Sequence, residues 1–408
     1  SFFTWTGTCQ HDNATRTTRA INVLYALTGC LDAPGGNVWF DKPPVADIAA
    51  FDRVTPEVRR QTIGLAERPL GPASRGWVTS RDLFRAIVSG SPGPITCFLS
   101  FGSNFLHSKP DTQFADEALK KLDFFALTEL YETPVARYAD LLLPVCTAWE
   151  REGLQAGFQV GQTAQAHLQL RPALVPPRGE SWPDTRIIFE LAHRLGLADE
   201  FFGGDPESGL RAQLAPTGLT PETLRDQNAH PHGITLPLVV RYRKYQQQGF
   251  ATPSRRVELY SEILYKHGED PLPGFSAPPA CTETFDLILT TAKWPQFCHS
   301  QHRDLPSLRR RMPEPLVEIH PLTAARRGIA AGDWLEVQTS LGHMRARARL
   351  DEHISPEVVC AQYGWWQFED GSGQANRILD GECFDPVAGS NNLRSTPCTI
   401  RAAGTSAS

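Results

Sequence analysis

Short apolar runs alternate with amphipathic segments through the first two thirds of this 408-residue chain. Residues 95–100, 124–130 and 139–144 have the composition of strands, whereas residues 113–122 and 184–196 have the spacing of helices. Continuous apolar strands separated by helices are typical of a parallel sheet covered on both faces. The sequence therefore predicts an α/β domain with a doubly wound parallel sheet. The helical faces expected to be buried consist of Phe114, Ala115, Ala118, Leu119 and Leu122, and of Ile187, Ile188, Leu191, Ala192 and Leu195.

The last third of the chain has a different pattern, of short strands separated by tight turns. Residues 333–340 and 343–350 predict a hairpin, because apolar and polar residues alternate strictly along the second of these segments. Further strands are predicted at 286–291 and 356–366, and several short strands of this kind favour a closed or nearly closed barrel. The predicted organisation is an α/β domain over residues 1–200, a connecting segment with little core over 201–280, and a β-barrel domain over 281–408.

The composition is that of a folded protein, with 41% apolar and 21% charged residues. The net charge of -5 does not indicate a nucleic-acid partner, and no apolar run approaches the ~20 residues of a membrane-spanning helix. The nine cysteines contain no C-x-x-C pair, so neither a disulfide framework nor a metal-cluster signature is present. Most of them are expected to be small buried side chains. The chain begins with Ser1 rather than Met, so we expect that it either was processed or is a piece of a longer protein.

Polar residues follow two of the predicted strands, at the point where each strand ends. Gly102 and Asn104 come after the first strand, and Thr128 and Glu129 end the second. In open α/β sheets, ligands bind beyond the carboxyl ends of the strands. Glycine allows a ligand to approach the backbone, and Asn and Glu can bind a ribose or a base edge. Ordinary turn chemistry is the alternative interpretation. The chain has no G-x-G-x-x-G and no P-loop, which disfavours a standard dinucleotide or triphosphate site.

A loop after the first strand of the last third, residues 289–303, is rich in hydrogen-bonding side chains. Such a loop suits a polyanionic ligand such as a diphosphate. Its Cys298, His299 and His302 do not have an accepted zinc spacing, which disfavours a zinc site. His11 is either a ligand or base or a structural histidine, and the pair of tryptophans at 365–366 is either a ligand wall or barrel core.

Ordered blocks along almost the whole chain resemble the molybdopterin oxidoreductases of the dimethyl-sulfoxide-reductase family. The blocks are ADLLLPVCTAWEREG, VPPRGESWPDTRIIFELAHRLG, YRKYQQQGFATPSRRVELYSEIL, EDPLPGF, EPLVEIHPLTAARRGIAAGDWLEV and ISPEVVCAQYGWW. Two of these segments, YRKYQQQGFATPS and GWW, are more similar to the thiosulfate/polysulfide-reductase and acetylene-hydratase branch than to nitrate reductases. The resemblance implies an α/β domain followed by a double-psi β-barrel. It also implies molybdenum or tungsten held by two molybdopterin guanine dinucleotides.

The resemblance assigns roles to residues of this chain, position by position. Gln10 and His11 would lie near the metal pocket, where His11 could assist proton transfer. Gly102, Asn104, Thr128 and Glu129 would hold a guanosine, and Arg151 and Asp184 would make further dinucleotide contacts. The loop residues Thr291, Lys293, His299 and Ser300 would wrap a pterin and its diphosphate, and Trp366, Asn376, Asn392 and Arg394 would make late barrel contacts.

The chain departs from the family at its beginning, where the family has a cysteine-rich cluster motif and a domain that supplies the protein ligand to the metal. The resemblance therefore implies that a 4Fe-4S cluster and the metal ligand belong to preceding domains of the same subunit, and none of the residues here is predicted to bind metal. An iron–sulfur electron-transfer subunit and a membrane anchor are expected partners, and the origin is expected to be bacterial or archaeal. The alternatives are a non-catalytic scaffold that retains the fold, and an unrelated hydrolase or binding protein.

Overall fold

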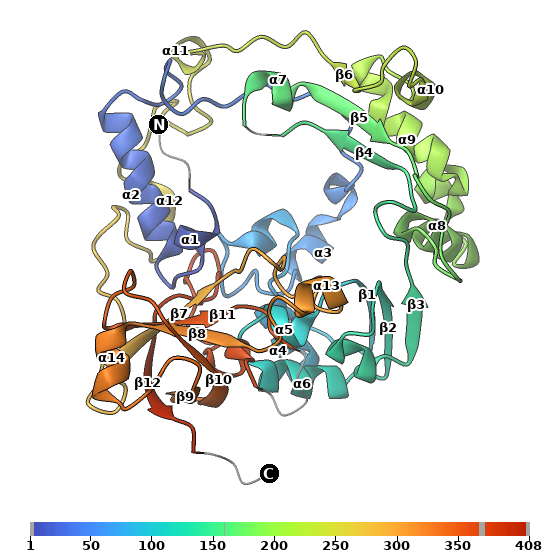
Figure 1. Cartoon of the computed structure of the whole chain (residues 1–408). Coiled ribbons are helices and arrows are strands. Elements are labelled where there is room, and N and C mark those ends of the chain that lie inside the picture. Colours follow the sequence, from blue (N-terminus) through green and yellow to red (C-terminus); the bar gives the residue numbers. More distant parts are fainter. Residues whose placement is uncertain (1–3, 159, 367–371, 405–408) are drawn as a thin grey trace.

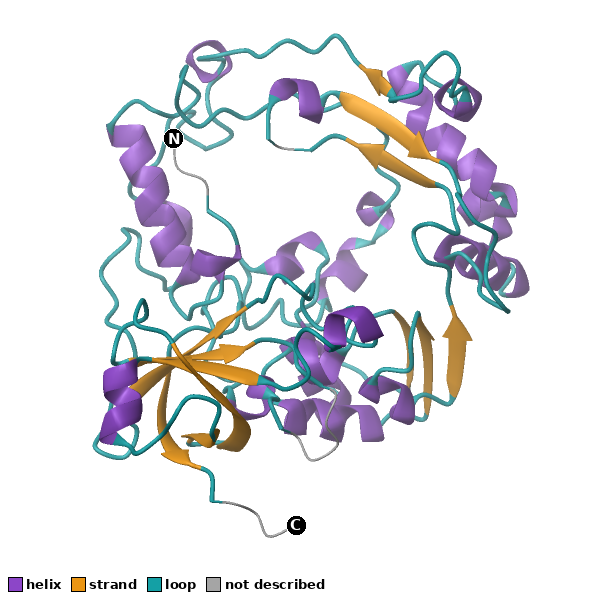
Figure 2. Ribbon diagram, viewed as in Figure 1, coloured by secondary structure: helices purple, strands orange, loops and turns teal. Residues whose placement is uncertain are grey.

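The computed structural model describes residues 4–158, 160–366 and 372–404. Its elements form three sheet-containing units joined by long loops, and Figure 1 shows them arranged around a ring. The barrel and the parallel sheet lie beside each other on one side of the ring, and the third sheet lies on the opposite side. Figure 2 shows how much of the remaining chain is loop. No helix within the described ranges is long and apolar enough to cross a membrane.

The parallel sheet consists of β1 (Cys97–Phe101), β2 (Phe124–Glu129) and β3 (Leu141–Pro144) in that order. Phe101 pairs with Thr128 and Glu129 pairs with Pro144, so the carboxyl ends of all three strands meet at one edge. The strands follow one another in chain order. The described part of the sheet therefore lacks the reversal of strand order that defines a doubly wound sheet, and the prediction was too specific in this respect.

Helices α4 (Ser80–Ser89), α5 (Phe105–Ser108) and α6 (Thr112–Lys120) contribute to the hydrophobic core of this unit. Ala115, Ala118 and Leu119 on α6 are fully or almost fully buried there, which confirms the predicted helical face. Burial of this kind contributes roughly 25 cal/mol for each Å² of apolar surface removed from water. The α6 face therefore anchors the connection between β1 and β2.

The last third forms a closed barrel with the strand order β10-β8-β11-β7-β12-β9 in the described chain. Met344, Ala346 and Ala348 of the predicted hairpin point into its core, which confirms the period-two pattern. Leu289 and Leu335, which are completely buried, lie in the same core. The strands are β7 (Leu287–Ala292), β8 (Leu316–Ile319), β9 (Trp334–Thr339), β10 (Gly342–Leu350), β11 (Val358–Gln362) and β12 (Thr396–Ala402).

A third unit is built from β4 (Gly153–Ala156), β5 (His167–Arg171) and β6 (Ile234–Thr235), with α9 (Pro206–Leu214) and α10 (Pro221–Arg225). Leu214 and Leu224 from the two helices are buried against Leu168 and Leu170 of β5. The segment after residue 200, expected to contain little core, thus shares a core with strands that precede it. Its hydrophobic residues are few and widely spaced, which is why periodicity did not reveal them.

Helix α8 (Asp184–Arg194) begins where predicted and ends two residues earlier, but it does not have the predicted burial. Ala192 is buried, whereas Leu191 is 37% exposed and Leu195 is 62% exposed. Its apolar face packs only in part, for example where the ring of Phe189 meets Phe201 edge-on at 6.0 Å between centroids. The amphipathic pattern was real, but most of the surface that would cover this face is not supplied by the described residues.

The cysteines also differ from expectation, because only Cys146, Cys360 and Cys398 are buried and the other six are exposed or half-buried. All nine are free thiols, as their spacing predicted. The remaining α-helices are α1 (Thr6–Cys9), α2 (Ala14–Leu27), α3 (Pro56–Arg60), α7 (Gln162–Gln165), α11 (Tyr245–Gln248), α12 (Glu262–Lys266), α13 (Pro306–Arg309) and α14 (Pro321–Arg326).

Candidate functional site

The carboxyl edge of the parallel sheet carries the first group of predicted residues. The backbone N–H of Gly102 donates to the carbonyl of Thr128 at 2.8 Å, which holds the ends of β1 and β2 together. Gly102 and Ser103 have φ values of +68° and +89°, a left-handed conformation that is uncommon for serine. A Cβ added to Gly102 would meet no atom within 4 Å. The glycine therefore leaves open space beside the backbone at this strand end.

Three buried polar atoms near this edge lack a hydrogen-bond partner within the described chain. They are Nδ2 of Asn104, Oγ1 of Thr128 and Nε of Arg151. Asn104 is 6% exposed and Thr128 is completely buried. An unsatisfied buried polar group costs about 1–3 kcal/mol, so a protein retains several of them in one region mainly where a ligand satisfies them. A hydroxyl, an amide and a guanidinium fit the oxygens and nitrogens of a nucleotide.

Glu129 ends β2 at the same edge. Burial raises the pKa of its carboxyl group, and the negative charge of Asp304 acts in the same direction, while the N–H of Leu130 opposes both. That N–H donates to Oε2 at 3.0 Å.

Arg151 and Asp184 lie beyond β3. The N–H of Val145 donates to the carbonyl of Glu129 at 3.2 Å, and the N–H of Cys146 donates to the carbonyl of Trp182 at 3.0 Å. These bonds bring the start of α8, with Asp184, to the same edge of the sheet. The side chain of Asp184 makes no hydrogen bond or ion pair with another described residue, so its role stays a prediction.

The second group joins the beginning of the chain to its end. Nε of Arg394 donates to Oε1 of Gln10 at 2.9 Å, and Nη1 donates to the carbonyl of Thr291 at 2.6 Å. The N–H of Leu393 donates to the carbonyl of Gln10 at 3.1 Å. Nδ1 of His11 lies 3.1 Å from Oγ of Ser395. The structure thus brings Gln10, His11, Thr291 and Arg394 together.

This second group is positively charged, and its pKa shifts reflect that. Burial lowers the pKa of His11; Asp12 opposes this, and Arg394 adds to it. Burial also lowers the pKa of Lys293, and the positive charge of Arg394 lowers it further. Burial lowers the pKa of His299 as well, and the positive charge of Lys293 adds to this decrease. Cations with few carboxylates beside them form a setting in which an anionic ligand such as a diphosphate is stabilised.

The two groups meet through the loops of the barrel. Nε1 of Trp366 donates to the carbonyl of Ser300 at 2.7 Å, and the ring of Trp366 lies 6.4 Å from that of His107 on α5. The hydroxyl of Tyr363 donates to the carbonyl of Ser108 at 2.7 Å. Trp365 is buried in a small core with Phe297 and Met312, as the structural interpretation predicted for that residue.

The side chain of Asn392 is held by bonds within its own turn, whereas both amide atoms of Asn376 are buried without a hydrogen-bond partner in the described part of the chain. Oδ1 of Asn392 accepts from the N–H groups of Arg394 and Ser395, at 3.2 and 3.1 Å, and its Nδ2 donates to the Ser395 carbonyl at 3.2 Å. Asn392 therefore shapes the turn that presents Arg394. Asn376 is 3% exposed in a short 3₁₀ helix, Ala375–Ile378.

Sequence reasoning missed Asp385 and His107. Asp385 is 1% exposed and accepts from the N–H and hydroxyl of Thr15, both at 2.7 Å, and from the N–H groups of Val387 and Ala388. It holds the start of α2, directly after His11, against the barrel. No local pattern indicated this, because the partners are 370 positions apart.

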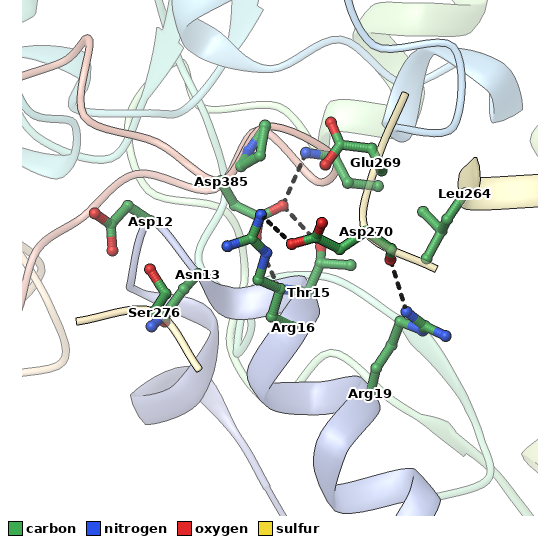
Figure 3. Close-up of a pocket in the computed structure, with 12 residues that line it drawn as sticks. Asp12, Asn13, Thr15, Arg16, Arg19, Leu264, Glu269, Asp270, Ser276 and Asp385 are labelled. Carbon is green, nitrogen blue, oxygen red and sulfur yellow. Dashed lines mark hydrogen bonds and ion pairs between the residues drawn. The ribbon is translucent and has the colours of Figure 1, made fainter. Parts of the chain in front are cut away.

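A hollow of about 110 Å³ lies beside the same helix start (Figure 3). Its polar groups bind one another: Nη2 of Arg16 lies 2.8 Å from Asp270, and Arg19 donates to the carbonyl of Pro271 at 2.8 Å. None of the predicted site residues lines this hollow. We therefore interpret it as a contact between α2 and the 269–276 loop.

No group of three or more metal-ligating side chains is present in the described part of the chain.

Unpaired buried polar atoms at a strand end and a cationic group in a barrel loop are features expected of a protein that binds a nucleotide-containing cofactor. The family model described as Molybdopterin oxidoreductase matches residues 2–194, and the model described as Molydopterin dinucleotide binding domain matches residues 287–397. The chain belongs to the molybdopterin oxidoreductase family. The cofactor of these domains is a molybdopterin dinucleotide that carries molybdenum or tungsten.

Individual relatives agree with this assignment. The chain is 28% identical to the dopamine dehydroxylase of Eggerthella lenta, over 94% of this chain and 46% of that protein. It is 30% identical to the acetylene hydratase of Syntrophotalea acetylenica, over 71% of this chain and 40% of that protein. The solved acetylene hydratase from Pelobacter acetylenicus has the same fold, with a TM-score of 0.82, 23% identity, and coverage of 97% of this chain and 60% of that one. The chain thus spans about half the length of these curated relatives.

Proposed function

We propose that this chain is the cofactor-binding portion of an enzyme that carries out two-electron redox chemistry or transfer of an oxygen or sulfur atom, with two molybdopterin guanine dinucleotides around one molybdenum or tungsten. The observation that carries the proposal is the pair of unpaired buried atoms on Asn104 and Thr128 at the strand edge, with a third on Arg151 in the segment that follows β3. The barrel, whose neighbouring strands are partly parallel and partly antiparallel, is proposed to have double-psi topology.

The residues of the strand edge would hold one guanosine. Nδ2 of Asn104 and Oγ1 of Thr128 can donate to its acceptors, and Glu129 can accept from a ribose hydroxyl. Gly102 would allow the ligand to approach the backbone, because nothing lies within 4 Å of the Cβ position. These interactions fix the orientation of the ligand and exclude water from the buried atoms.

The cationic group would hold the phosphates and the pterin. Lys293, His299 and Arg394 would stabilise negative charge, and Thr291 and Gln10 fix the direction of the Arg394 guanidinium. When bound, the cofactor supplies the two-electron redox step. His11 is neutral near pH 7, because its pKa is lowered by burial, and its Nδ1 is engaged with Ser395. Its Nε2 is the atom proposed to hold or pass a proton.

Further domains of the same subunit are proposed to complete the site. Several large aromatic side chains are strongly exposed in the described chain, among them the four most exposed tryptophans, and exposed apolar side chains that form a patch are typical of surfaces that contact another protein or domain. We propose that these domains bear the iron–sulfur cluster and the metal ligand, and that an iron–sulfur subunit and a membrane anchor are further partners. The exposed tryptophans are Trp5, Trp39, Trp77 and Trp149, with exposed fractions of 69%, 51%, 62% and 60%.

The proposal is tested on the natural protein, purified without oxygen from its host. Guanine nucleotide released by acid is quantified by chromatography, and molybdenum and tungsten by elemental mass spectrometry. We expect two guanine nucleotides for each metal atom. One nucleotide per metal would contradict the paired cofactor, and a protein without metal or nucleotide would favour the non-catalytic scaffold.

A matched pair of variants locates the nucleotide. Thr128→Val preserves shape but removes the unpaired hydroxyl, and we expect it to lower the retained guanine nucleotide several-fold. Thr235→Val, on β6 in the third unit, is the control and should retain the wild-type amount. Equal retention in both variants would contradict a ligand at the β2 strand end.

A further inference from the structure

Asn104 and His107 form a buried pair at the start of α5. They are 6% and 3% exposed, and Nδ1 of His107 lies 2.9 Å from Oδ1 of Asn104. The amide oxygen can only accept, so Nδ1 of the histidine must carry the proton. The pair therefore fixes both the tautomer of the ring and the orientation of the amide.

The histidine is neutral in this position. Burial is the largest cause, and the positive charges of Arg137 and Arg303 add to it, so that the pKa of His107 is lowered to about 3. A neutral ring with its proton on Nδ1 leaves Nε2 as an acceptor.

The pair has one unused donor and one unused acceptor. Nδ2 of Asn104 and Nε2 of His107 are both buried and have no hydrogen-bond partner in the described ranges of the chain. Asn104 immediately precedes α5, where asparagine commonly caps a helix, yet its side chain makes no capping bond. The amide is thus directed to His107 instead of its own helix. Trp366 of the barrel lies near His107, with 6.4 Å between the centroids of the two rings.

We propose that His107 is a positioning residue. It holds the Asn104 amide so that Nδ2 is available to the nucleotide end of the cofactor. Nε2 of His107 accepts a hydrogen bond from an N–H or O–H group of the same ligand. The inference rests on the proposed function, since the ligand is the guanosine assigned to this strand edge. A base edge that presents an acceptor beside an N–H donor, as a cyclic amide does, complements this pair. If the ring instead carried its proton on Nε2, Nδ1 would repel the Asn104 oxygen, and the amide would turn its donor away from the ligand.

The two amide mimics of histidine test the tautomer. The His107→Asn variant can place a side-chain N–H near the position that Nδ1 of His107 occupies. The longer side chain of His107→Gln places an N–H near the position of Nε2. In the natural protein, we expect His107→Asn, which keeps the bond to Asn104 but lacks the Nε2 acceptor, to lose guanine nucleotide two- to threefold, and His107→Gln and His107→Phe to lose it at least tenfold. His343→Asn, on the outer side of β10, is the control and should behave as wild type.

A second variant separates positioning from folding. Asn104→Asp keeps an oxygen for His107 but lacks Nδ2, so it should lose nucleotide at least tenfold while thermal unfolding of nucleotide-free protein stays within a few degrees of wild type. Equal retention by all His107 variants, equal loss by Asn and Gln, or full retention by Asn104→Asp would each overturn the inference while leaving the proposed function intact. Wild-type protein that carries no guanine nucleotide would instead overturn the proposed function, and this inference with it.

Discussion

Arg394 joins segments that are far apart in the sequence. Its guanidinium contacts the Gln10 side chain and the Thr291 carbonyl, at separations of 384 and 103 positions. Three planar N–H directions make arginine suited to such a junction, and lysine could not reproduce it. The same charge acts on His11, whose imidazole is less able to bind a proton beside it.

Arg394→Gln is expected to raise the pKa of His11, because it removes a positive charge that lowers it. The pKa is measured from the pH dependence of diethylpyrocarbonate labelling of His11, followed by peptide mass spectrometry. Arg401→Gln is the control, because Arg401 pairs with Glu336 on β9 and is not among the causes of the His11 shift. An unchanged or lower pKa in Arg394→Gln would contradict the electrostatic assignment.

His107 is expected to make the protein less stable in acid. Its folded-state pKa of about 3 lies below the ordinary value of 6.5, so between these values the unfolded chain binds a proton that the folded chain does not. Stability is therefore lost as the pH falls below about 6.5, by at most ~1.4 kcal/mol for each pH unit from this residue. Urea unfolding at pH 7 and pH 5 should show a larger decrease for wild type than for His107→Asn. Equal decreases would show that His107 does not titrate in this way.

Among the elements, the helix α2 depends on a residue outside it. Asp385 binds the first turn of α2 and two N–H groups of its own loop. Asp385→Ala leaves these donors unsatisfied and should lower the free energy of unfolding by about 1–3 kcal/mol. It should also increase hydrogen exchange in residues 10–15. Asp205→Ala, which removes the cap of α9, is the control and should leave exchange in residues 10–15 unchanged.

The barrel depends on the buried face of its hairpin. Leu335→Ala on β9 should cost about 2–5 kcal/mol, because the completely buried side chain leaves a cavity. Leu341, in the turn between β9 and β10, is 41% exposed, and Leu341→Ala should cost less than about 0.5 kcal/mol. Chemical denaturation of the two variants measures the difference. Similar values would contradict the assignment of the hairpin faces.

Elements with a partner nearby in the sequence could be predicted, and others could not. The β9–β10 hairpin was predictable because the strands are adjacent and their two faces have different chemistry. The polar atoms at the ends of β1 and β2 were predictable because parallel strands place their carboxyl ends at one edge. The burial of α8 was not, because an amphipathic pattern shows that a face is apolar and not what covers it. Asp385 was missed because its contact with Thr15 spans 370 positions. His107 was missed because its bond to Asn104, three positions away, depends on burial of both side chains, which leaves no periodic signal.

At the scale of the whole molecule, the exposed tryptophans allow a test of the proposed contacts with further domains. In the natural protein, we expect Trp39, Trp77 and Trp149 to be protected from hydroxyl-radical oxidation, because the proposed further domains would cover them. Trp334, on the barrel strand β9, provides an internal reference. Peptide mass spectrometry of the intact and the denatured protein measures the protection. Equal oxidation of the exposed tryptophans in both samples would contradict a covering domain.

The hydrogen bonds between residues 10–15 and residues 385–395 also determine when, during synthesis, this part of the site can form. During synthesis the ribosome produces Gln10 and Thr15 hundreds of residues before Arg394 and Asp385, which bind them. Segments that are synthesised first can fold first, but residues 10–15 cannot form these hydrogen bonds until the barrel loops have emerged. The charged part of the site therefore forms only after residues 385–395 have emerged, so that any large ligand held there must be loaded after the barrel loops have been made.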